Sequence, residues 1–382
     1  MRRRLRGQWL PLRARRIIND YICTLMKVAV VILNWNTADY LKRFLPGILD
    51  SCRKCGDAEV LVADSGSSDG SLEMLSECFP EVGTIPLESN YGFAGGYNRA
   101  LLEVEAEYAV LLNSDVEAGG DWIAPLSGWM DSHPDCAACG PKILSLSEKD
   151  RFEYAGAAGG LADRFGYTFC RGRVMKRVEK DCGQWDDSPA DVFWVSGACM
   201  MVRMSAWKES GGFDGRFFAH MEEIDWCWRM WLRGWEISVV TSSAVWHLGG
   251  GSLHQDSPEK LRLNFRNNLL MLENNLVGTF IAQGSTPRKA AAKARMRLGA
   301  RMVLDLCSAA VYLLGGRKEA AKAVVRAHSE FRSMRKGVPA STVVRKNERE
   351  AKVPAGYFDG SMIFEALLRG KGVFEYFRRK RI

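Results

Sequence analysis

Residues 27–36 read KVAVVILNWN, and residues 59–71 read EVLVADSGSSDGS. Each segment is a short run of aliphatic and β-branched residues that ends in polar side chains, which is typical of a buried strand. We expect strands at 28–33, 59–63, 82–87 and 108–112, and helices at 39–49, 70–78 and 95–104. This alternation predicts βαβ units and a mostly parallel sheet flanked by helices, the α/β class. Ligands of such sheets bind beyond the carboxyl ends of the strands, so polar residues at those ends are the candidates for chemistry.

The second half of the chain has a different composition. After about residue 135 glycine-rich and aromatic segments prevail, with strands expected at 192–202 and 236–240. From about 260 onward Lys, Arg, Ala and Leu dominate and favour helices, while 284–287 and 337–354 have the composition of linkers. We divide the chain into a basic arm at 1–25, an α/β domain at 26–275 and a basic, mainly helical C-terminal extension at 276–382.

The formal net charge of +8 is unevenly distributed. Residues 1–25 hold seven arginines and one acid, residues 285–382 hold 23 basic and 8 acidic side chains, and residues 26–284 hold 23 basic and 36 acidic ones. A pI near 8.9 invites nucleic acid as a partner. A nucleic-acid-binding protein, however, interleaves basic and aromatic residues on one folded face. Here the positive charge lies at the two ends, which disfavours nucleic acid.

Cysteine usage and hydropathy bear on the compartment. Eleven cysteines are scattered over 382 residues, which favours reduced thiols and a cytoplasmic protein over a disulfide scaffold. No run reaches the ~20 apolar residues that span a bilayer, and the longest, 302–314, contains Asp305. The arginine-rich start lacks the apolar segment of a secretory signal. Because Met26 immediately precedes a strand, we interpret 1–25 as a misassigned start or a disordered basic arm.

Two predicted strand ends carry groups that suit a nucleotide. The first strand ends in Asn34-Trp35-Asn36 and the second in Asp64, whose carboxylate could accept from a ribose hydroxyl or a base N–H. In the same turn Asp69 could equally cap the next helix. Residues 90–98, NYGFAGGYN, place glycines before a helix, where backbone N–H groups can face a pyrophosphate. The pattern is not GxGxxG, which disfavours a dinucleotide dehydrogenase.

Further candidates lie in the remaining strand ends and in an acidic aromatic segment. Asp115 in LLNSDV, 111–116, could hold a hard cation that bridges two phosphates, or could cap a loop. Residues 217–229, FFAHMEEIDWCWR, place three acids among aromatic side chains, a setting that raises a pKa and suits a general base. On a helix Glu222, Asp225 and Arg229 share one face while Glu223 points elsewhere. His247 could ligate a metal or be structural.

Eight motifs in this order resemble the family-2 glycosyltransferases of the GT-A fold, particularly a bacterial rhamnosyltransferase-like branch. The motifs are ILNWN at 32–36, ADSGSSDGS at 63–71, SNYGFAGGYN at 89–98, LLNSDV at 111–116, VSGACMMVR at 195–203, GGFDGRFF at 211–218, MEEIDWCWR at 221–229 and AVWHLGGGS at 244–252. The resemblance covers residues 27–275 and includes Arg266-Asn267. One motif alone is a weak signal, whereas eight in order form a strong one.

The resemblance implies a nucleotide-sugar donor, Mg²⁺ or Mn²⁺, and an inverting single displacement. It implies that Asp64 contacts the nucleobase, that Trp35 packs near it, and that Asp69 supports the same pocket. The donor-binding residues it implies are Asn34, Trp35, Asn36, Asp64, Asp69, Asn90, Gly92, Phe93, Asn98, Asn113 and Ser114.

The resemblance also implies the metal site and the base. Asp115 matches the metal-binding acid of the family's D-x-D motif and His247 matches the position that completes the site, whereas Asn113 replaces the motif's first acid and leaves fewer anionic ligands. Glu223 occupies the position of the family's aspartate base with a longer side chain. Asp225 is the second candidate for the catalytic base, beside Glu222. Trp226 and Arg229 are implied at the donor or acceptor sugar, although tryptophans at this helical spacing also suit core packing.

The implied reaction delivers the sugar to a glycan or lipid-linked glycan in bacterial surface polysaccharide assembly, with dTDP-rhamnose favoured over UDP- or GDP-sugars. The basic extension then suits an anionic membrane surface, with the enzyme peripheral at the cytoplasmic face of the inner membrane. A solvated extension that packs on the acidic domain is the alternative for that segment. A non-catalytic paralogue that binds sugar nucleotides or glycans is the alternative for the whole chain.

Overall fold

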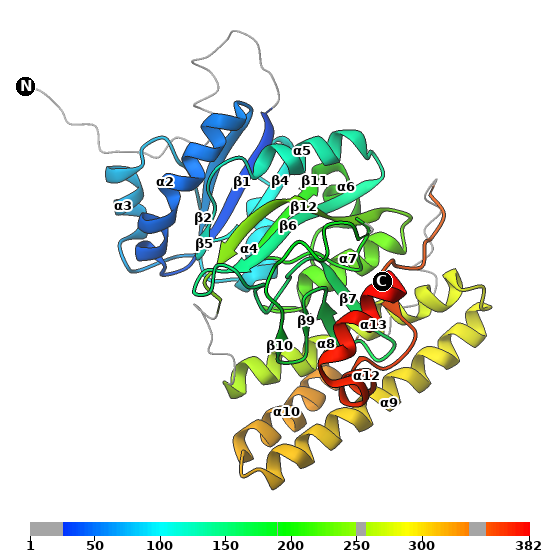
Figure 1. Ribbon diagram of the computed structural model, residues 1–382. Coiled ribbons are helices and arrows are strands. Elements are labelled where there is room, and N and C mark those ends of the chain that lie inside the picture. The colour runs from blue at the N-terminus through cyan, green and yellow to red at the C-terminus, as the bar shows by residue number, and fades with distance from the viewer. Residues whose placement is uncertain (1–25, 189, 250–256, 336–348) are drawn as a thin grey trace, which may run out of the picture.

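The computed structural model describes residues 26–188, 190–249, 257–335 and 349–382. Its centre is an eight-stranded sheet in the order β3-β2-β1-β4-β11-β6-β12-β5 (Figure 1). The strands are β1 (Met26–Asn34), β2 (Ala58–Asp64), β3 (Gly83–Pro86), β4 (Ala106–Asn113), β5 (Val116–Glu117), β6 (Cys136–Ser145), β11 (Cys199–Arg203) and β12 (Glu236–His247). Only β11 and β5 of these eight run against the others, so the predicted mostly parallel sheet is confirmed.

The central strand β1 explains why helices cover both faces of the sheet. Its side chains alternate between two cores: Val30 and Ile32 face one, and Ala29 and Val31 face the other. Helices α2 (Ala38–Cys55), α3 (Ser71–Cys78) and α5 (Ile123–Ser132) close the first core, and α4 (Gly92–Ala100), α6 (Met204–Ser210) and α7 (Glu222–Trp231) close the second. A strand that is apolar on both sides is therefore buried on both sides, as its sequence predicts.

A second sheet joins the C-terminal residues to the rest of the chain. Its order is β10-β9-β8-β7-β13, with β7 (Gly160–Asp163), β8 (Thr168–Cys170), β9 (Arg173–Val174), β10 (Arg177–Val178) and β13 (Tyr357–Phe358). Tyr357 of β13 pairs in parallel with Ala162 of β7. Helix α8 (Pro258–Ala282) runs without a break through residue 275, where we expected a domain boundary. The C-terminal extension thus packs on the α/β body and shares a helix and a sheet with it.

The remaining helices form a layer along the lower edge of the view in Figure 1. They are α9 (Pro287–Leu314), α10 (Lys318–Met334), α12 (Met362–Arg369) and α13 (Val373–Lys380). Buried polar contacts join two helices of this layer, because Asp305 of α9 accepts from Arg301 Nε of the same helix at 2.7 Å and lies 3.3 Å from His328 Nε2 of α10. No helix of the described residues is long and apolar enough to cross a bilayer.

Several sequence-based boundaries differ from the structure, and three of them bear on the site. The strand expected at 192–202 is limited to β11, because residues 191 and 194 make isolated bridges to Ser238 and Gly160 instead of a ladder. The helix expected at 95–104 begins at Gly92, where the Asn90 side chain accepts from the Gly92 N–H, and ends at Ala100. The strand expected at 236–240 continues past an irregularity to His247. The arm at 1–25 and most of the linker at 337–354 lie outside the described residues.

Candidate active site

The ends of β1 and β2 meet in register, and Asn34 lies opposite Asp64. Asn34 Nδ2 donates to Asp64 Oδ1 at 2.7 Å, and the Ser67 N–H donates to Asp64 Oδ2 at 2.9 Å. Both residues are buried, so this pair fixes the turn that follows β2 relative to the turn that follows β1. The geometry brings the two predicted nucleotide-contacting strand ends into one site at the carboxyl edge of the sheet.

Asp69 ties the same two turns together from the other side. Its carboxylate accepts from the Ala38 N–H at 2.8 Å and from the N–H and hydroxyl of Ser71. Although burial opposes ionisation, these donors lower the pKa of Asp69. Trp35, between the two turns, is 51% exposed and presents an open aromatic face. Asn36 has a φ of 54° and accepts from the Ser68 N–H at 2.8 Å, which holds the turn around that indole.

The start of α4 packs against two later segments of the chain. The Phe93 N–H donates to the Phe218 carbonyl at 2.7 Å, and the Phe93 ring lies beside Gly197. Gly92 has a φ of +70°, and a Cβ there would lie 2.3 Å from the Phe218 carbonyl oxygen. The absence of a side chain at Gly92 therefore lets the backbone of α4 lie close to the loop before α7. The same feature would let a phosphate approach this backbone.

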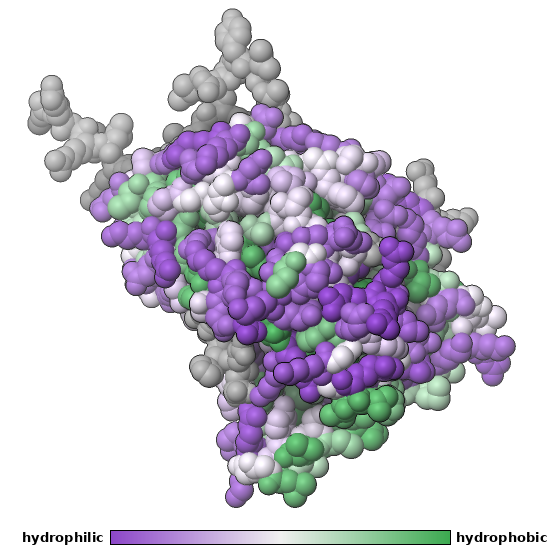
Figure 2. Space-filling model, viewed as in Figure 1, coloured by the Kyte–Doolittle hydropathy of each residue, from purple (hydrophilic) through white to green (hydrophobic). Residues whose placement is uncertain are grey.

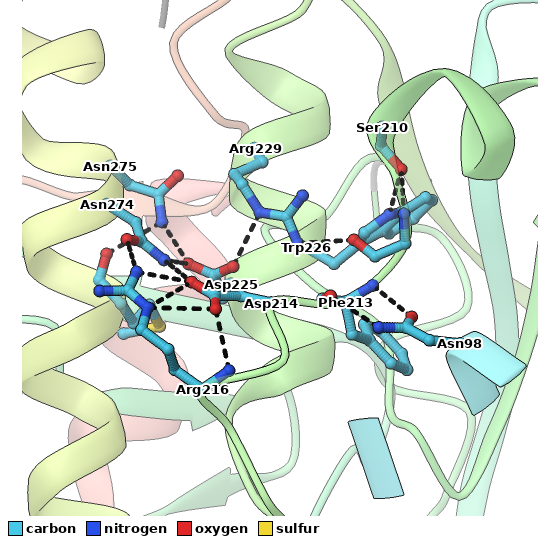
Figure 3. Close-up of polar contacts among 12 residues, drawn as sticks. Asn98, Ser210, Phe213, Asp214, Arg216, Asp225, Trp226, Arg229, Asn274 and Asn275 are labelled. Carbon is cyan, nitrogen blue, oxygen red and sulfur yellow. Dashed lines mark hydrogen bonds and ion pairs between the residues drawn. The ribbon is translucent and has the colours of Figure 1, made fainter. Parts of the chain in front are cut away.

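Asn98 has a structural role that the sequence did not predict. Its Nδ2 donates to the Phe213 carbonyl and its Oδ1 accepts from the Phe213 N–H, both at 2.9 Å (Figure 3). Because both ends of this amide bond the backbone of Phe213, Asn98 positions the 211–218 loop. Its contact with the donor nucleotide stays a prediction.

Asp115 and His247, which are 132 residues apart, meet because β5 pairs with the end of β12. Their Oδ1 and Nε2 atoms lie 3.1 Å apart, and the Leu248 N–H donates to the Asp115 carbonyl. Asn113 Nδ2 lies 3.4 Å from the same imidazole nitrogen, with Ser114 in the turn between the two residues. The structure thus brings the predicted metal-binding residues together, with the amide that replaces the first acid beside them.

A carboxylate that sequence reasoning missed lies behind the imidazole. Glu153 Oε1 is 3.8 Å from His247 Nδ1, on the opposite side of the ring from Asp115. Burial opposes protonation of His247, but the two carboxylates outweigh it and raise the pKa of His247 to about 10. Glu153 belongs to none of the sequence motifs. Only the expectation that a buried histidine has a hydrogen-bond acceptor for its second ring nitrogen could have indicated it.

Glu222 and Glu223 begin α7 in a buried setting. Glu222 is buried and Glu223 half-buried, and among the described residues neither Oε2 atom has a hydrogen-bond partner. Burial raises the pKa of Glu223 to about 7, even though backbone N–H groups favour its charged form. Burial and repulsion from Glu223 raise the pKa of Glu222 well above its ordinary value. A carboxylate that titrates near neutral pH with an open oxygen suits a general base.

The loop before these acids is held by α8. Asn267 Nδ2 donates to the carbonyls of Ala219 and His220 at 2.8 and 2.7 Å, and Arg266 Nε donates to the Asn267 side chain. His220 and Met221 both have φ values of 73°, a backbone conformation that L side chains rarely adopt. The Arg-Asn pair that accompanies the motifs therefore supports the strained turn from which Glu222 and Glu223 project.

Asp225 lies in a network of hydrogen bonds between α7 and α8 (Figure 3). Its Oδ1 accepts from Asn274 and Asn275 at 2.9 Å each, and its Oδ2 accepts from Arg229 Nε at 2.8 Å. Asp225 is fully buried, and Arg229 also donates to the Gly212 carbonyl. Both residues therefore join α7 to α8 and to the 211–218 loop.

The prediction of Trp226 at a sugar is wrong. Its side chain is fully buried, its Nε1 donates to Ser210 Oγ at 2.8 Å, and its ring packs on Trp207. The other tryptophans of this segment, Trp228, Trp231 and Trp235, are also buried. Core packing, the alternative for this set, is the one the structure supports. A cavity of about 340 Å³ beside Arg229 is lined by Ser210–Asp214, Arg216, Leu232, Arg233 and the two asparagines of α8, and so lies apart from Glu223 and Asp115.

Comparisons with known proteins agree with this geometry. Residues 29–206 match the family described as Glycosyl transferase family 2. The chain is 26% identical over 267 residues to the N-acetylglucosaminyl-diphospho-decaprenol L-rhamnosyltransferase of Mycobacterium tuberculosis, with 65% of this chain and 85% of that protein aligned. It is 23% identical over 230 residues to rhamnosyltransferase WbbL of Escherichia coli, with 58% and 83% aligned.

A solved structure supports the fold. The crystal structure of GalNAc-T7 with UDP, GalNAc and Mn²⁺ superposes with a TM-score of 0.50 at 17% identity, covering 66% of this chain. The aligned part spans 48% of that longer chain, so the likeness bears on the fold alone. Residues 29–206 thus form a family-2 glycosyltransferase domain, and with the two rhamnosyltransferases they identify an enzyme that transfers sugar from a nucleotide sugar in glycan biosynthesis, while the superposed structure supports the GT-A fold.

Proposed function

We propose that this enzyme transfers a sugar with inversion to a hydroxyl of a glycan or lipid-linked glycan, and that Glu223 is the general base. The observation that carries the proposal is the Glu223 carboxylate, which starts a helix, keeps a buried oxygen without a partner among the described residues, and has a pKa raised to about 7 by burial. A base of this kind is partly deprotonated at neutral pH and can take the proton of an acceptor hydroxyl as it attacks.

Asp225 and Glu222 suit the base role less well than Glu223. Asp225 already accepts three hydrogen bonds, from Arg229 and from the two α8 asparagines. Glu222 is more deeply buried than Glu223, and burial together with repulsion from Glu223 raises its pKa. In this arrangement Glu222 tunes the charge beside the base.

The donor atoms at Asp115 and His247 fit a divalent cation. The raised pKa of His247 places a proton between Nε2 and Asp115 Oδ1, which lie 3.1 Å apart, while Nδ1 faces Glu153. A divalent cation could take the place of that proton between the two atoms. A carboxylate behind a metal-binding histidine is a common arrangement. Within the described ranges no three His, Cys, Asp or Glu side chains are placed to hold one metal ion together, so these two would leave coordination positions for phosphate and water.

When bound, Mg²⁺ or Mn²⁺ neutralises the charge that develops on a departing diphosphate. The chain's own groups bind and orient around it. Asp115 and His247 would hold the cation, Glu153 fixes the imidazole, and the exposed Trp35 indole offers a stacking surface for the nucleobase near Asp64. The mycobacterial relative is named for transfer of L-rhamnose to a decaprenol-linked sugar. We extend that chemistry to this chain, with dTDP-rhamnose as the favoured donor, UDP- and GDP-sugars next, and peripheral attachment to the membrane that holds such an acceptor.

A donor screen followed by one variant tests the proposal. Thermal unfolding is measured with dTDP, UDP and GDP, each with and without Mn²⁺, and the stabilising nucleotide then selects the sugars for a transfer assay. We expect one nucleotide to raise the unfolding midpoint only with the metal, and Glu223→Gln to abolish transfer while it preserves that shift. Glu103→Gln, which removes an exposed carboxylate, is the matched control. Nucleotide binding with no transfer by the unaltered chain on any sugar would instead indicate a non-catalytic binding protein.

A further inference from the structure

We propose that the outer face of α9, together with the end of α12, docks on an anionic lipid bilayer. This inference rests on the proposed lipid-linked acceptor for its purpose, but it is argued from the surface of the helical layer alone. It assigns a partner to a part of the chain that contributes nothing to the catalytic residues.

Helix α9 exposes apolar side chains and buries charged ones, the reverse of an ordinary surface helix. From residue 296 to 314 its exposed large side chains are all apolar, namely Met296, Val303, Leu306, Val311, Leu313 and Leu314, the last 90% exposed. Of the three charged residues in that stretch, Arg301 and Asp305 are buried and pair at 2.7 Å. The third, Arg297, donates to the Arg164 carbonyl and the Tyr357 hydroxyl. An ordinary surface helix places its charges in water and its apolar stripe on the core.

Helix α12 repeats this arrangement close to α9. It buries Met362 and Ala366, while Phe364, Leu367 and Leu368 are exposed, Leu367 by 74%. The contact between Arg297 of α9 and Tyr357, five residues before α12, keeps the two helices near each other. Figure 2 shows the hydrophobic side chains of this layer gathered along the lower edge of the molecule, where Figure 1 places α12 and the end of α9. We call these nine exposed side chains on α9 and α12 the apolar patch.

Cations flank the apolar patch. Exposed basic residues occur where α9 begins, where it ends and where α12 ends: Arg288, Lys289, Lys293 and Arg295, then Arg317 and Lys318, then Arg369 and Lys371. Residues 285–382 together carry 23 basic against 8 acidic side chains. An apolar face with basic edges is the composition of helices that lie in the interface of an anionic bilayer.

The charge also argues against a second copy of the chain as the occupant. A two-fold dimer through the apolar patch would place each cationic edge against the same surface of its partner. An anionic bilayer meets the same edge with opposite charge and accepts the apolar side chains below its headgroups. Because Arg301 and Asp305 are paired inside the protein, α9 keeps its contacts with α8 and α10 and offers lipid only its outer face.

Vesicle co-sedimentation tests the proposal without donor or acceptor, so its result does not depend on the proposed function. We expect the full chain to bind vesicles of phosphatidylethanolamine with about one third phosphatidylglycerol, to bind pure phosphatidylcholine weakly, and to dissociate in high salt. Val303→Glu and Leu367→Glu should each lower the partition coefficient at least about tenfold. Lys289→Ala should lower it about fivefold, the equivalent of one cation near the surface. Leu102→Glu, at an apolar residue that is 81% exposed on the α/β body, is the matched control and should change nothing.

Cys307 gives a second readout, because it is exposed on the same helix. With Cys23, Cys78 and Cys182 replaced by serine, a polarity-sensitive dye on Cys307 should shift its emission to the blue when anionic vesicles are added. Transfer to a water-soluble acceptor should survive Val303→Glu, which separates loss of docking from loss of folding. Equal vesicle binding by Val303→Glu and Leu102→Glu, or a dimer whose formation shields the dye without lipid, would overturn the proposal.

Discussion

Replacing Glu223 by glutamine should weaken catalysis and strengthen the fold at the same time. The pKa of Glu223 rises from its ordinary 4.5 to about 7 because burial disfavours the charged form. In the unfolded chain the carboxyl is deprotonated above pH 4.5, whereas in the folded chain it keeps its proton up to about pH 7. The folded state therefore binds more protons in this window, and stability falls as the pH rises through it. A shift of this size corresponds to about 3 kcal/mol lost above pH 7.

Glutamine carries no charge at any pH, so Glu223→Gln should recover most of that free energy above pH 7 and little of it below about pH 4.5. Removal of a general base lowers the rate by about 10²- to 10⁴-fold. In the unaltered enzyme, kcat/KM should rise about tenfold per pH unit below pH 7 and level off above it, because only the deprotonated carboxylate accepts a proton. Release of nucleoside diphosphate across the pH range measures the rate, and urea unfolding at two pH values measures the stability.

Two results would refute this reasoning. If Glu223→Gln kept the activity of Glu103→Gln, Glu223 would not be the base. If the variant were inactive but no more stable than the unaltered chain above pH 7, the carboxylate would not be held against a burial penalty, and the raised pKa could not explain the choice of this residue. The two measurements are independent because one follows the reaction and the other the fold.

Three further variants address the surroundings of the site. Glu153→Gln should lower Mn²⁺ affinity by about 10- to 100-fold in calorimetry, because it loosens the imidazole that Glu153 orients. Arg229→Met should destabilise the fold by about 3–5 kcal/mol in urea unfolding, because it leaves the buried Asp225 carboxylate without its cation; an unchanged midpoint would contradict the network. Gly92→Ala should lower both stability and transfer, since its Cβ would meet a backbone carbonyl, whereas Gly119→Ala, which has open space, should be neutral in both assays.

The sequence predicts the donor edge of the sheet well because the rule behind it is topological. Parallel strands end at the same edge, so the polar residues after β1 and β2 had to meet, and Asn34 bonds Asp64 directly. The pairing of Asp115 with His247 depends on the short antiparallel strand β5, which carries no periodic signal in two residues. Their meeting was therefore predicted through the family resemblance, and Glu153, which belongs to no motif, was not predicted at all.

The structural roles of Asn98 and Trp226 were missed for a common physical reason. An amide or an indole in a motif can bind a ligand or can satisfy the protein's own polar groups, and residue type does not distinguish the two. Asn98 pairs with the backbone of Phe213, and Trp226 donates to Ser210, both partners more than 15 residues distant along the chain. Only the fold brings these partners together, so composition and spacing could not separate a structural group from a functional one.

The three acids of α7 show how a structural carboxylate can hold a neighbouring carboxylate in the position of a general base. Successive helical residues are turned by about 100°, so Glu223 and Asp225 point to different sides of α7 although two positions separate them. The side of Asp225 meets α8, where two asparagines and Arg229 satisfy the charge and anchor the helix. The anchored helix can then hold Glu223 in a buried place where its Oε2 has no partner among the described residues. Asp225, whose carboxylate is hydrogen-bonded, thus supports Glu223, whose Oε2 has no partner among the described residues. Moving the acid from position 225 to a neighbouring position would remove the anchor of α7 and, with it, the position of the base.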